Sequence, residues 1–303
     1  MDKPLFLVAD KNMYYYPHEE VCICPIVPSF ANRVLRQVCR KTNQPFPEEM
    51  MHPLLRKGRE RIIIFTDFAF FDNFPILPFL KRTYGQDHII LYYMNHISPK
   101  SALYMQHFSK VCCFDRKDAE KYHIHYVPLP FTNYYNPENT IVQIQQDAIF
   151  LGQNKGRERK LLVLKKELEA NGFHTRFMMT GTGNSELCLK KKIPYDDYIQ
   201  MVKSSRCVVE LMMEDQAGYT LRAMEALFLR KKLITDNVSV IHEPWYNKRN
   251  IFLLGKDGLE DLSAFITTPY SDTGFDLHTL NFSEWIDTYD WKASQYEDKD
   301  RSE

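Results

Sequence analysis

The chain has 303 residues, 44% hydrophobic and 26% charged, a balance typical of a globular protein with packed cores. Lysine plus arginine and aspartate plus glutamate each total 39, so the formal net charge is zero. This balance argues against broad electrostatic capture of nucleic acid, which needs a surplus of cations. The length suits two domains of ordinary size.

Neither a membrane span nor a secretory signal is visible in the sequence. No apolar run approaches the roughly 18 residues that cross a bilayer, and the first such run is too short for a signal peptide. The seven cysteines lack the spacing of zinc pairs and lie mostly in apolar runs. We therefore expect a cytoplasmic protein, with peripheral contact at the inner membrane face left open.

Short apolar runs alternate with helical patterns along the first half, which is typical of βαβ units and a parallel sheet. The expected strands are 5–9, 61–67, 88–94, 111–115 and 125–128. The expected helices are 28–41 and 73–84, the second interrupted near its start by Pro75 and Pro78.

The polar segment 130–146 predicts a linker, after which the alternation starts again. The expected strands are 147–152, 175–179, 207–212 and 232–235. The expected helices are 158–171, 196–204 and 220–229, followed by an amphipathic helix with a Ser283 cap within 283–296.

The stretch from Glu210 to Asn237 combines a strand, a loop that contains Gly218, and a helix that opens at Thr220. A glycine loop leading into a helix presents backbone N–H groups at the positive end of the helix dipole, an arrangement that binds a diphosphate. Gly218 permits close approach of the backbone, and Thr220 is suited to cap the helix or to contact phosphate. In the second helical turn, Glu225 is placed to accept both hydroxyls of a ribose.

This order of residues resembles the donor-binding half of GT-B glycosyltransferases, in particular bacterial polysaccharide and lipopolysaccharide glycosyltransferases. In that family Gln-x-Gly-x-Thr-x-Arg precedes Glu-Ala-Leu, and the matching residues here are Gln216, Gly218, Thr220, Arg222 and Glu225. The resemblance implies that the loop, which includes Tyr219, holds the diphosphate of a nucleotide sugar and that Glu225 holds its ribose. It extends from residue 147 to about 254 and is only architectural before that.

The resemblance also implies the fold: an α/β chain with two Rossmann-like domains facing a central cleft. Residues 1–135 would form the acceptor domain, 136–282 the nucleotide-sugar domain, and 283–303 a helix and tail that return to the first domain. The implied partners are a nucleoside-diphosphate sugar, which is a substrate and not a cofactor, and a glycan or lipid-linked acceptor. No metal is expected, because the one Asp-x-Asp, Asp298–Asp300, lies in the charged tail.

One departure leaves the stereochemistry open. Many retaining members carry a second glutamate at the position that is Ala217 here. A structural role for the motif is also left open, since Glu225 could pair with Arg222 as a surface ion pair.

Two further groups are candidates. The turn after the first strand of the second domain offers Gly152 and Arg157, with Lys155 and Arg159 nearby, to neutralise the departing nucleoside diphosphate. For an inverting reaction, the catalytic base is expected from the ends of first-domain strands, at Asp67 or His96.

The sequence therefore predicts a glycosyltransferase. A nucleotide-sugar epimerase of the same fold and a catalytically silent scaffold protein stay as alternatives. The sugar, the nucleotide, the acceptor and the oligomeric state are not indicated.

Overall fold

The computed structural model describes residues 3–8, 16, 22–26, 30–42, 44–58, 60–66, 76–135, 142–181, 185–213, 216–289 and 291. Contacts divide the chain into two compact units, Met1–Pro130 with His278–Glu303, and Phe131–Leu277. The boundaries expected after residues 135 and 282 lie a few residues further along the chain. Of the residues and segments named above, Asp67, Pro75 and the tail after residue 291, which contains Asp298–Asp300, lie outside the described residues.

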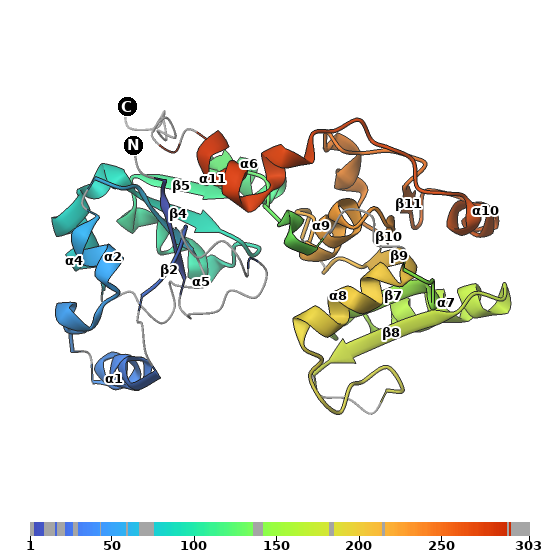
Figure 1. Cartoon of the computed structure of the whole chain (residues 1–303), viewed down its shortest axis with the longest axis horizontal. Helices are drawn as coiled ribbons and strands as arrows, with labels where there is room; N and C mark the ends of the chain where they lie inside the picture. The colour runs from blue at the N-terminus through green and yellow to red at the C-terminus, as the bar shows by residue number, and fades with distance from the viewer. Residues whose placement is uncertain are drawn as a thin grey trace. The chain divides into compact units, whose positions relative to one another are not determined.

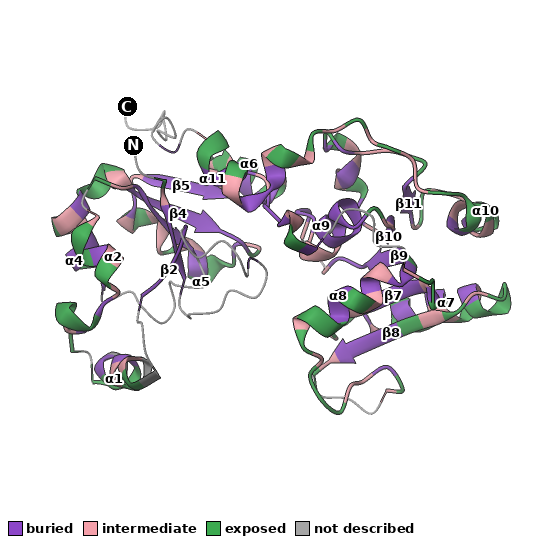
Figure 2. Cartoon of the chain, viewed as in Figure 1, coloured by how far each residue is buried: buried purple, intermediate pink, exposed green. Residues whose placement is uncertain are grey.

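Within the described residues, the first unit contains a parallel sheet of six strands in the order β2-β1-β3-β4-β5-β6 (Figure 1). The strands are β1 (Leu5–Val8), β2 (Ile23–Pro25), β3 (Ile63–Thr66), β4 (Ile89–Tyr93), β5 (Lys110–Cys113) and β6 (His125–Tyr126). The first five are buried along their length, as expected for parallel strands covered on both faces (Figure 2). The predicted strands are confirmed within a few residues. β2 was not predicted, because a three-residue edge strand leaves too little pattern.

The helices of this unit are α1 (Phe30–Lys41), α2 (Pro53–Lys57), α4 (Leu77–Tyr84), α5 (Pro99–Ala102), α6 (Arg116–Tyr122) and α11 (Phe282–Thr288). α4 begins at Leu77, with a proline in its first turn, where a missing N–H costs nothing. Asp115 caps α6, since its carboxylate accepts hydrogen bonds from the backbone N–H groups of Lys117 and Asp118. No helix in the described part of the chain has the length and apolar character needed to cross a bilayer.

The last helix belongs to the first unit, as predicted. The ring of Phe282 lies 5.1 Å from that of Phe6, and Trp285 lies 5.5 Å from Tyr92 in β4. Figure 1 shows α11, in red, next to the strands of this unit. Its cap was predicted wrongly: Asn281, not Ser283, is the N-cap residue, and the helix ends at Thr288.

The second unit contains, among its described residues, a parallel five-stranded sheet in the order β11-β10-β9-β7-β8. The strands are β7 (Gln146–Gln153), β8 (Thr175–Thr180), β9 (Ser205–Glu210), β10 (Lys232–Thr235) and β11 (Ile251–Leu253). The four strands predicted from apolar runs are confirmed. β11 was not predicted, because its short apolar run does not by its pattern alone distinguish a strand from other structure.

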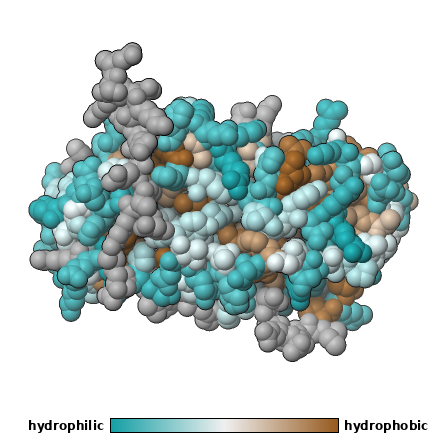
Figure 3. All heavy atoms as spheres, turned by 90° about the horizontal axis from the view of Figure 1, so that it is seen from above, coloured by the Kyte–Doolittle hydropathy of each residue, from teal (hydrophilic) through white to brown (hydrophobic). Residues whose placement is uncertain are grey.

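The helices of the second unit are α7 (Glu158–Ala170), α8 (Tyr195–Lys203), α9 (Leu221–Phe228) and α10 (Leu262–Thr267). The segment predicted as a linker is partly built into this unit. The ring of Phe131 packs 5.3 Å from that of Phe228 in α9. On the face drawn in Figure 3, hydrophobic residues form separate patches among hydrophilic ones.

Candidate functional site

The loop before α9 is held by a buried carboxylate that sequence reasoning did not single out. Glu210 ends β9 and is fully buried. Its Oε1 accepts hydrogen bonds from the backbone N–H and the hydroxyl of Thr220, both at 2.7 Å. Its Oε2 accepts one from the hydroxyl of Thr235 at 2.9 Å. Glu210 therefore ties the start of α9 to two strand ends, and burial raises its pKa.

Thr220 is the N-cap of α9. Its Oγ1 accepts a hydrogen bond from the backbone N–H of Arg222 at 3.2 Å. Because its hydroxyl and its own N–H both donate to Glu210, Thr220 supports the loop and presents neither donor to a ligand. Thr220 was expected either to cap the helix or to contact phosphate, and the structure shows it as the cap.

The rest of the loop is anchored by its own polar groups and by its neighbours. The side-chain amide of Gln216 donates to the carbonyl oxygen of Gly218 at 3.2 Å. The amide of Asn237 donates to the carbonyl oxygen of Ala217 at 3.1 Å. Tyr219 is buried, and its ring lies 5.4 Å from that of Trp245. Tyr219 therefore packs in the core of the unit.

Glu225 lies inside the unit and not on its surface. It is 2% exposed. Its Oε1 accepts a hydrogen bond from the hydroxyl of Tyr195 at 2.9 Å, and its Oε2 accepts one from that of Tyr198 at 2.8 Å. Burial raises its pKa, while the two phenols and the charge of Arg222 oppose the rise. The alternative of an exposed ion pair with Arg222 is wrong.

Arg222 reaches from α9 across the end of β7. Its Nη1 donates to the carbonyl oxygen of Leu151 at 3.0 Å, and the guanidinium carbon lies 5.0 Å from the ring centre of Phe150. A Cβ atom at Gly152 would lie 2.9 Å from that Nη1. A side chain at position 152 would therefore require the guanidinium of Arg222 to shift.

Three cations gather at this strand end. Arg157 is 5% exposed, and burial together with the charge of Arg222 lowers its pKa to about 10. Burial and the charges of Arg157 and Arg222 likewise lower the pKa of Lys155. Among the described residues, the Nε atoms of Arg157 and Arg222 have no hydrogen-bond partner. Such mutual repulsion and unused donors are what an anion would relieve.

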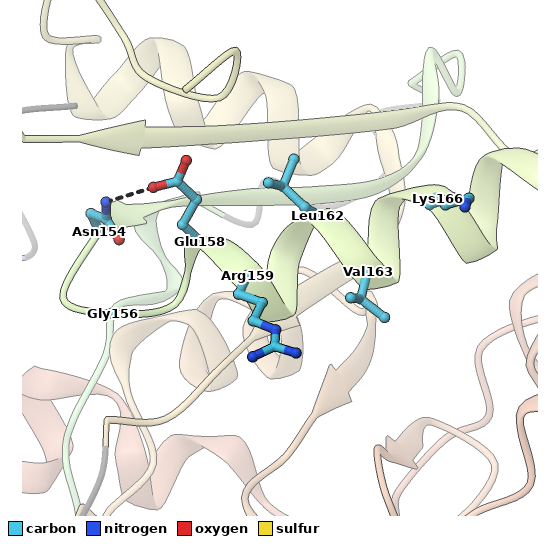
Figure 4. Close-up of a pocket in the computed structure, with 7 residues that line it drawn as sticks. All are labelled: Asn154, Gly156, Glu158, Arg159, Leu162, Val163 and Lys166. Carbon is cyan, nitrogen blue, oxygen red and sulfur yellow. Dashed lines mark hydrogen bonds between the residues drawn. The ribbon is translucent and has the colours of Figure 1, made fainter. Parts of the chain in front are cut away.

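A depression beside this turn is not lined by these three cations. It has a volume of about 740 Å³ and is lined by Asn154, Gly156, Glu158, Arg159, Leu162, Val163 and Lys166. Figure 4 shows Asn154 and Gly156 in the turn before α7 and the other side chains spread along the helix, with the amide of Asn154 bonded to the carboxylate of Glu158. Val163 is 65% exposed, so this is a shallow surface along the helix.

In the first unit, His96 follows β4 and meets two carboxylates at the carboxyl edge of the sheet. Its Nδ1 lies 3.0 Å from Oδ2 of Asp118 in α6. The same Oδ2 accepts a hydrogen bond from the backbone N–H of Ile97 at 2.8 Å. Ligand atoms of His96, Asp115 and Asp118 lie within 4.8 Å of one another, the one group among the described residues with the composition of a metal site.

That group already has protein partners. One oxygen of Asp115 accepts hydrogen bonds from the start of α6, and Asp118 faces His96. Burial raises the pKa of Asp118, and the His96 contact opposes that rise. Nδ1 of His96 has no hydrogen-bond partner among the described residues, so its 3.0 Å contact with Asp118 is a close approach to a carboxylate without hydrogen-bond geometry.

The structure thus brings together Gly152, Arg157 and Arg222 at one strand end, with Glu225 further along the same helix as Arg222. It adds Glu210, Tyr195, Tyr198 and Asp118, which sequence reasoning missed. The available signals were a glutamate at the end of an apolar strand, two tyrosines on one helix face, and an acidic residue after the β5 strand. Each signal is common in proteins and gains meaning only from its neighbours.

Two solved structures are similar to most of this chain. A UDP-forming α,α-trehalose-phosphate synthase from Burkholderia xenovorans has a TM-score of 0.54 and 10% identity, covering 94% of this chain and 84% of the other. The N-terminal domain of a Candida albicans trehalose-6-phosphate phosphatase has a TM-score of 0.50 and 9% identity, covering 85% and 72%. No protein-family model and no curated protein matches the sequence. At these identities the likeness is one of fold, and it confirms the predicted α/β fold of GT-B type with two Rossmann-like domains.

Proposed function

We propose that this protein is a glycosyltransferase that takes its sugar from a nucleoside-diphosphate sugar. The observation that carries the proposal is the group of Lys155, Arg157 and Arg222 at the carboxyl end of β7. Burial, and after it the repulsion among these cations, lowers the pKa of Lys155 and Arg157, and a diphosphate among them would offset that repulsion. Negative charge grows on the departing nucleoside diphosphate as the glycosidic bond breaks, so cations here favour departure.

The loop at 216–220 has a supporting part in this proposal. The N-terminal end of α9 favours a nearby anion through its dipole. Because Glu210 occupies the donors of Thr220, the side chains of Arg157 and Arg222 are assigned the direct contacts with phosphate. Gln216, Gly218 and Tyr219 are assigned to the shape of the loop.

Glu225 is assigned to the ribose of the donor. A carboxylate accepts hydrogen bonds from hydroxyl groups, which a ribose supplies. Arg222, three residues earlier on the same helix, is assigned to the diphosphate. Neighbouring positions on one helix would then bind neighbouring parts of one nucleotide.

For an inverting transfer, we propose His96 as the base. It would accept the proton of the acceptor hydroxyl as that oxygen attacks the anomeric carbon and the bond to the nucleoside diphosphate breaks. Asp118 would fix the ring through Nδ1 and leave Nε2 to take the proton. Asp67 stays a second prediction for this role. A glycan or lipid-linked molecule is proposed as the acceptor, on the family resemblance alone.

The test is calorimetric binding of UDP-, ADP-, GDP- and CDP-sugars, followed by release of nucleoside diphosphate in the presence of acceptors. Selective binding of one donor is expected. Arg157→Gln should weaken it by about 10-fold to 100-fold, the worth of a charge-assisted hydrogen bond. Arg176→Gln, at an exposed arginine in β8 of the same unit, is the control and should bind as the wild type does.

The outcomes separate the alternatives. Conversion of the donor to a stereoisomer without an acceptor would identify an epimerase. If the folded wild-type protein binds no nucleoside diphosphate and no donor, the glycosyltransferase proposal is wrong and a scaffold role replaces it. Equal loss of binding in both arginine variants would show a diffuse charge effect in place of a phosphate site.

A further inference from the structure

The carboxylate assigned to the ribose is already occupied in the ligand-free protein. Each oxygen of Glu225 accepts one phenol hydrogen bond, from Tyr195 and Tyr198 respectively. With the residue 2% exposed, a ribose diol cannot reach it unless a neighbouring side chain moves. Because an unpaired buried carboxylate is costly, any such movement must be matched by a replacement donor.

The two phenols differ in how firmly they are held. Tyr198 is 3% exposed and lies on the buried face of α8 beside Ile199 and Val202. Tyr195 is only half-buried and is the first residue of the helix, where Pro194 provides no side-chain cap. Its ring meets that of Tyr135 edge to face at 5.6 Å. Tyr195 can therefore turn away at lower cost than Tyr198.

We propose that the hydroxyl of Tyr195 stands in for a ribose hydroxyl and is exchanged for it when the nucleotide binds. In the ligand-free protein Tyr195 donates to Oε1 of Glu225. In the complex a ribose hydroxyl donates to Oε1, and Tyr198 stays on Oε2 and holds the carboxylate in place. This inference rests on the proposed function, since it takes a ribonucleotide as the ligand.

The exchange has a consequence for affinity. One O–H donor replaces another, so the buried carboxylate has the same number of hydrogen bonds before and after the exchange. The cost is that the wild-type protein must break the Tyr195 bond before it gains the ribose bond. Breaking that bond makes binding less favourable by the strength of the bond. A variant without the Tyr195 hydroxyl has no such bond to break and should bind more tightly.

The test compares two matched substitutions, Tyr195→Phe and Tyr198→Phe, each of which removes one phenol hydroxyl from the same carboxylate. The probes are UDP, ADP, GDP and CDP, of which the tightest binder is carried forward with its 2′,3′-dideoxy counterpart. Tyr195→Phe should bind the ribonucleotide about tenfold more tightly than wild type, by the size of one hydrogen bond. Its preference for ribose over dideoxyribose should rise by a similar factor.

Tyr198→Phe should change binding in the opposite direction. It removes the anchor that stays in place in both states, so affinity should fall about tenfold. Tyr135→Phe is the control for the loss of a phenol hydroxyl from this aromatic cluster, because its hydroxyl donates to Asp196 and not to Glu225. Its ratio of ribose to dideoxyribose binding should equal that of the wild type. Thermal unfolding of each variant is measured first.

The sign of the Tyr195→Phe effect decides the inference. Weaker binding, or unchanged binding and an unchanged ribose preference, would overturn the exchange and leave Tyr195 as a structural partner of Glu225. If Tyr198→Phe does not fold, the affinity change of Tyr195→Phe and its preference for ribose over dideoxyribose are sufficient to test the exchange. A wild-type protein that binds none of the four nucleotides would instead refute the proposed function itself.

Discussion

The indole nitrogen of Trp285 donates a hydrogen bond to the carbonyl oxygen of Pro128 at 2.9 Å. The hydroxyl of Tyr92 donates to the same oxygen at 3.2 Å, and that of Tyr16 donates to the carbonyl of Pro130 at 3.0 Å. The chain segment that leaves the first unit is therefore held by the helix that returns to it. Since Trp285 is fully buried, we expect the returning helix to be necessary for the stability of this unit.

Replacing Trp285 tests that expectation. Trp285→Ala removes a large buried ring and should lower the free energy of unfolding by about 3–5 kcal/mol. Trp285→Phe keeps most of the ring contact but loses the bond to Pro128, so it should cost less. Chemical denaturation followed by circular dichroism measures both, with Leu259→Ala at a half-exposed position as the control. A loss below about 1 kcal/mol for Trp285→Ala would show that α11 only rests on the surface.

A second prediction concerns the close approach of Gly152 and Arg222. The added methyl group of Gly152→Ala would lie 2.9 Å from Nη1 of the arginine and must displace it. We expect nucleotide affinity to fall about tenfold, the worth of one charge-assisted hydrogen bond, with a stability loss of about 1 kcal/mol. The double variant with Arg222→Ala provides the check. If Gly152→Ala still weakens binding when the arginine is absent, the glycine acts by another route.

The buried carboxylate of Glu210 predicts a pH dependence of stability. Burial raises its folded-state pKa above the ordinary value of 4.5. Ionisation is then more costly in the folded than in the unfolded chain, so its contribution to stability is greatest below pH 4.5 and declines as pH rises through the folded-state pKa. Glu210→Gln does not ionise, so its free energy of unfolding should not decline with pH for this reason. Relative to wild type, its free energy of unfolding should increase from pH 4.5 towards neutrality, measured by denaturant titration at each pH. A constant difference would contradict the raised pKa.

The contact between His96 and Asp118 predicts a substitution that lowers the rate of transfer without weakening donor binding. Asp118→Asn keeps an oxygen for the backbone N–H of Ile97 but removes the charge that orients the imidazole. If His96 is the base, kcat for transfer should fall about 10²-fold, within the range of general base catalysis. The Kd of the nucleotide should stay unchanged, because the donor residues belong to the other unit. Parallel loss of both would indicate a structural role for Asp118.

The sequence by itself determined the alternation of strands and helices and the existence of two sheets. Runs such as Ile63–Thr66 are apolar on both faces, which is typical of a parallel strand that is buried on both faces of its sheet. The helix at Leu221–Phe228 and its cap at Thr220 were readable for the same reason, since capping and helical periodicity are local properties. The edge strands β2 and β11, of three residues each, could not be predicted from the sequence. They are strands because they pair with a neighbouring strand, and not because of a local pattern.

Only the tertiary structure decided the partners of the site residues. Glu210 and Thr220 come together because two strand ends and a helix start meet at one sheet edge. Arg157 and Arg222 are far apart in the chain, and only folding both buries Arg157 and brings the charge of Arg222 close enough to lower its pKa. The sequence left open whether Glu225 holds a ribose or forms a surface ion pair, and it did not indicate that the packing of α8 on α9 buries this carboxylate beneath two tyrosines. Hydrogen bonding and charge interaction act over a few ångströms of space, and sequence separation carries no record of that distance.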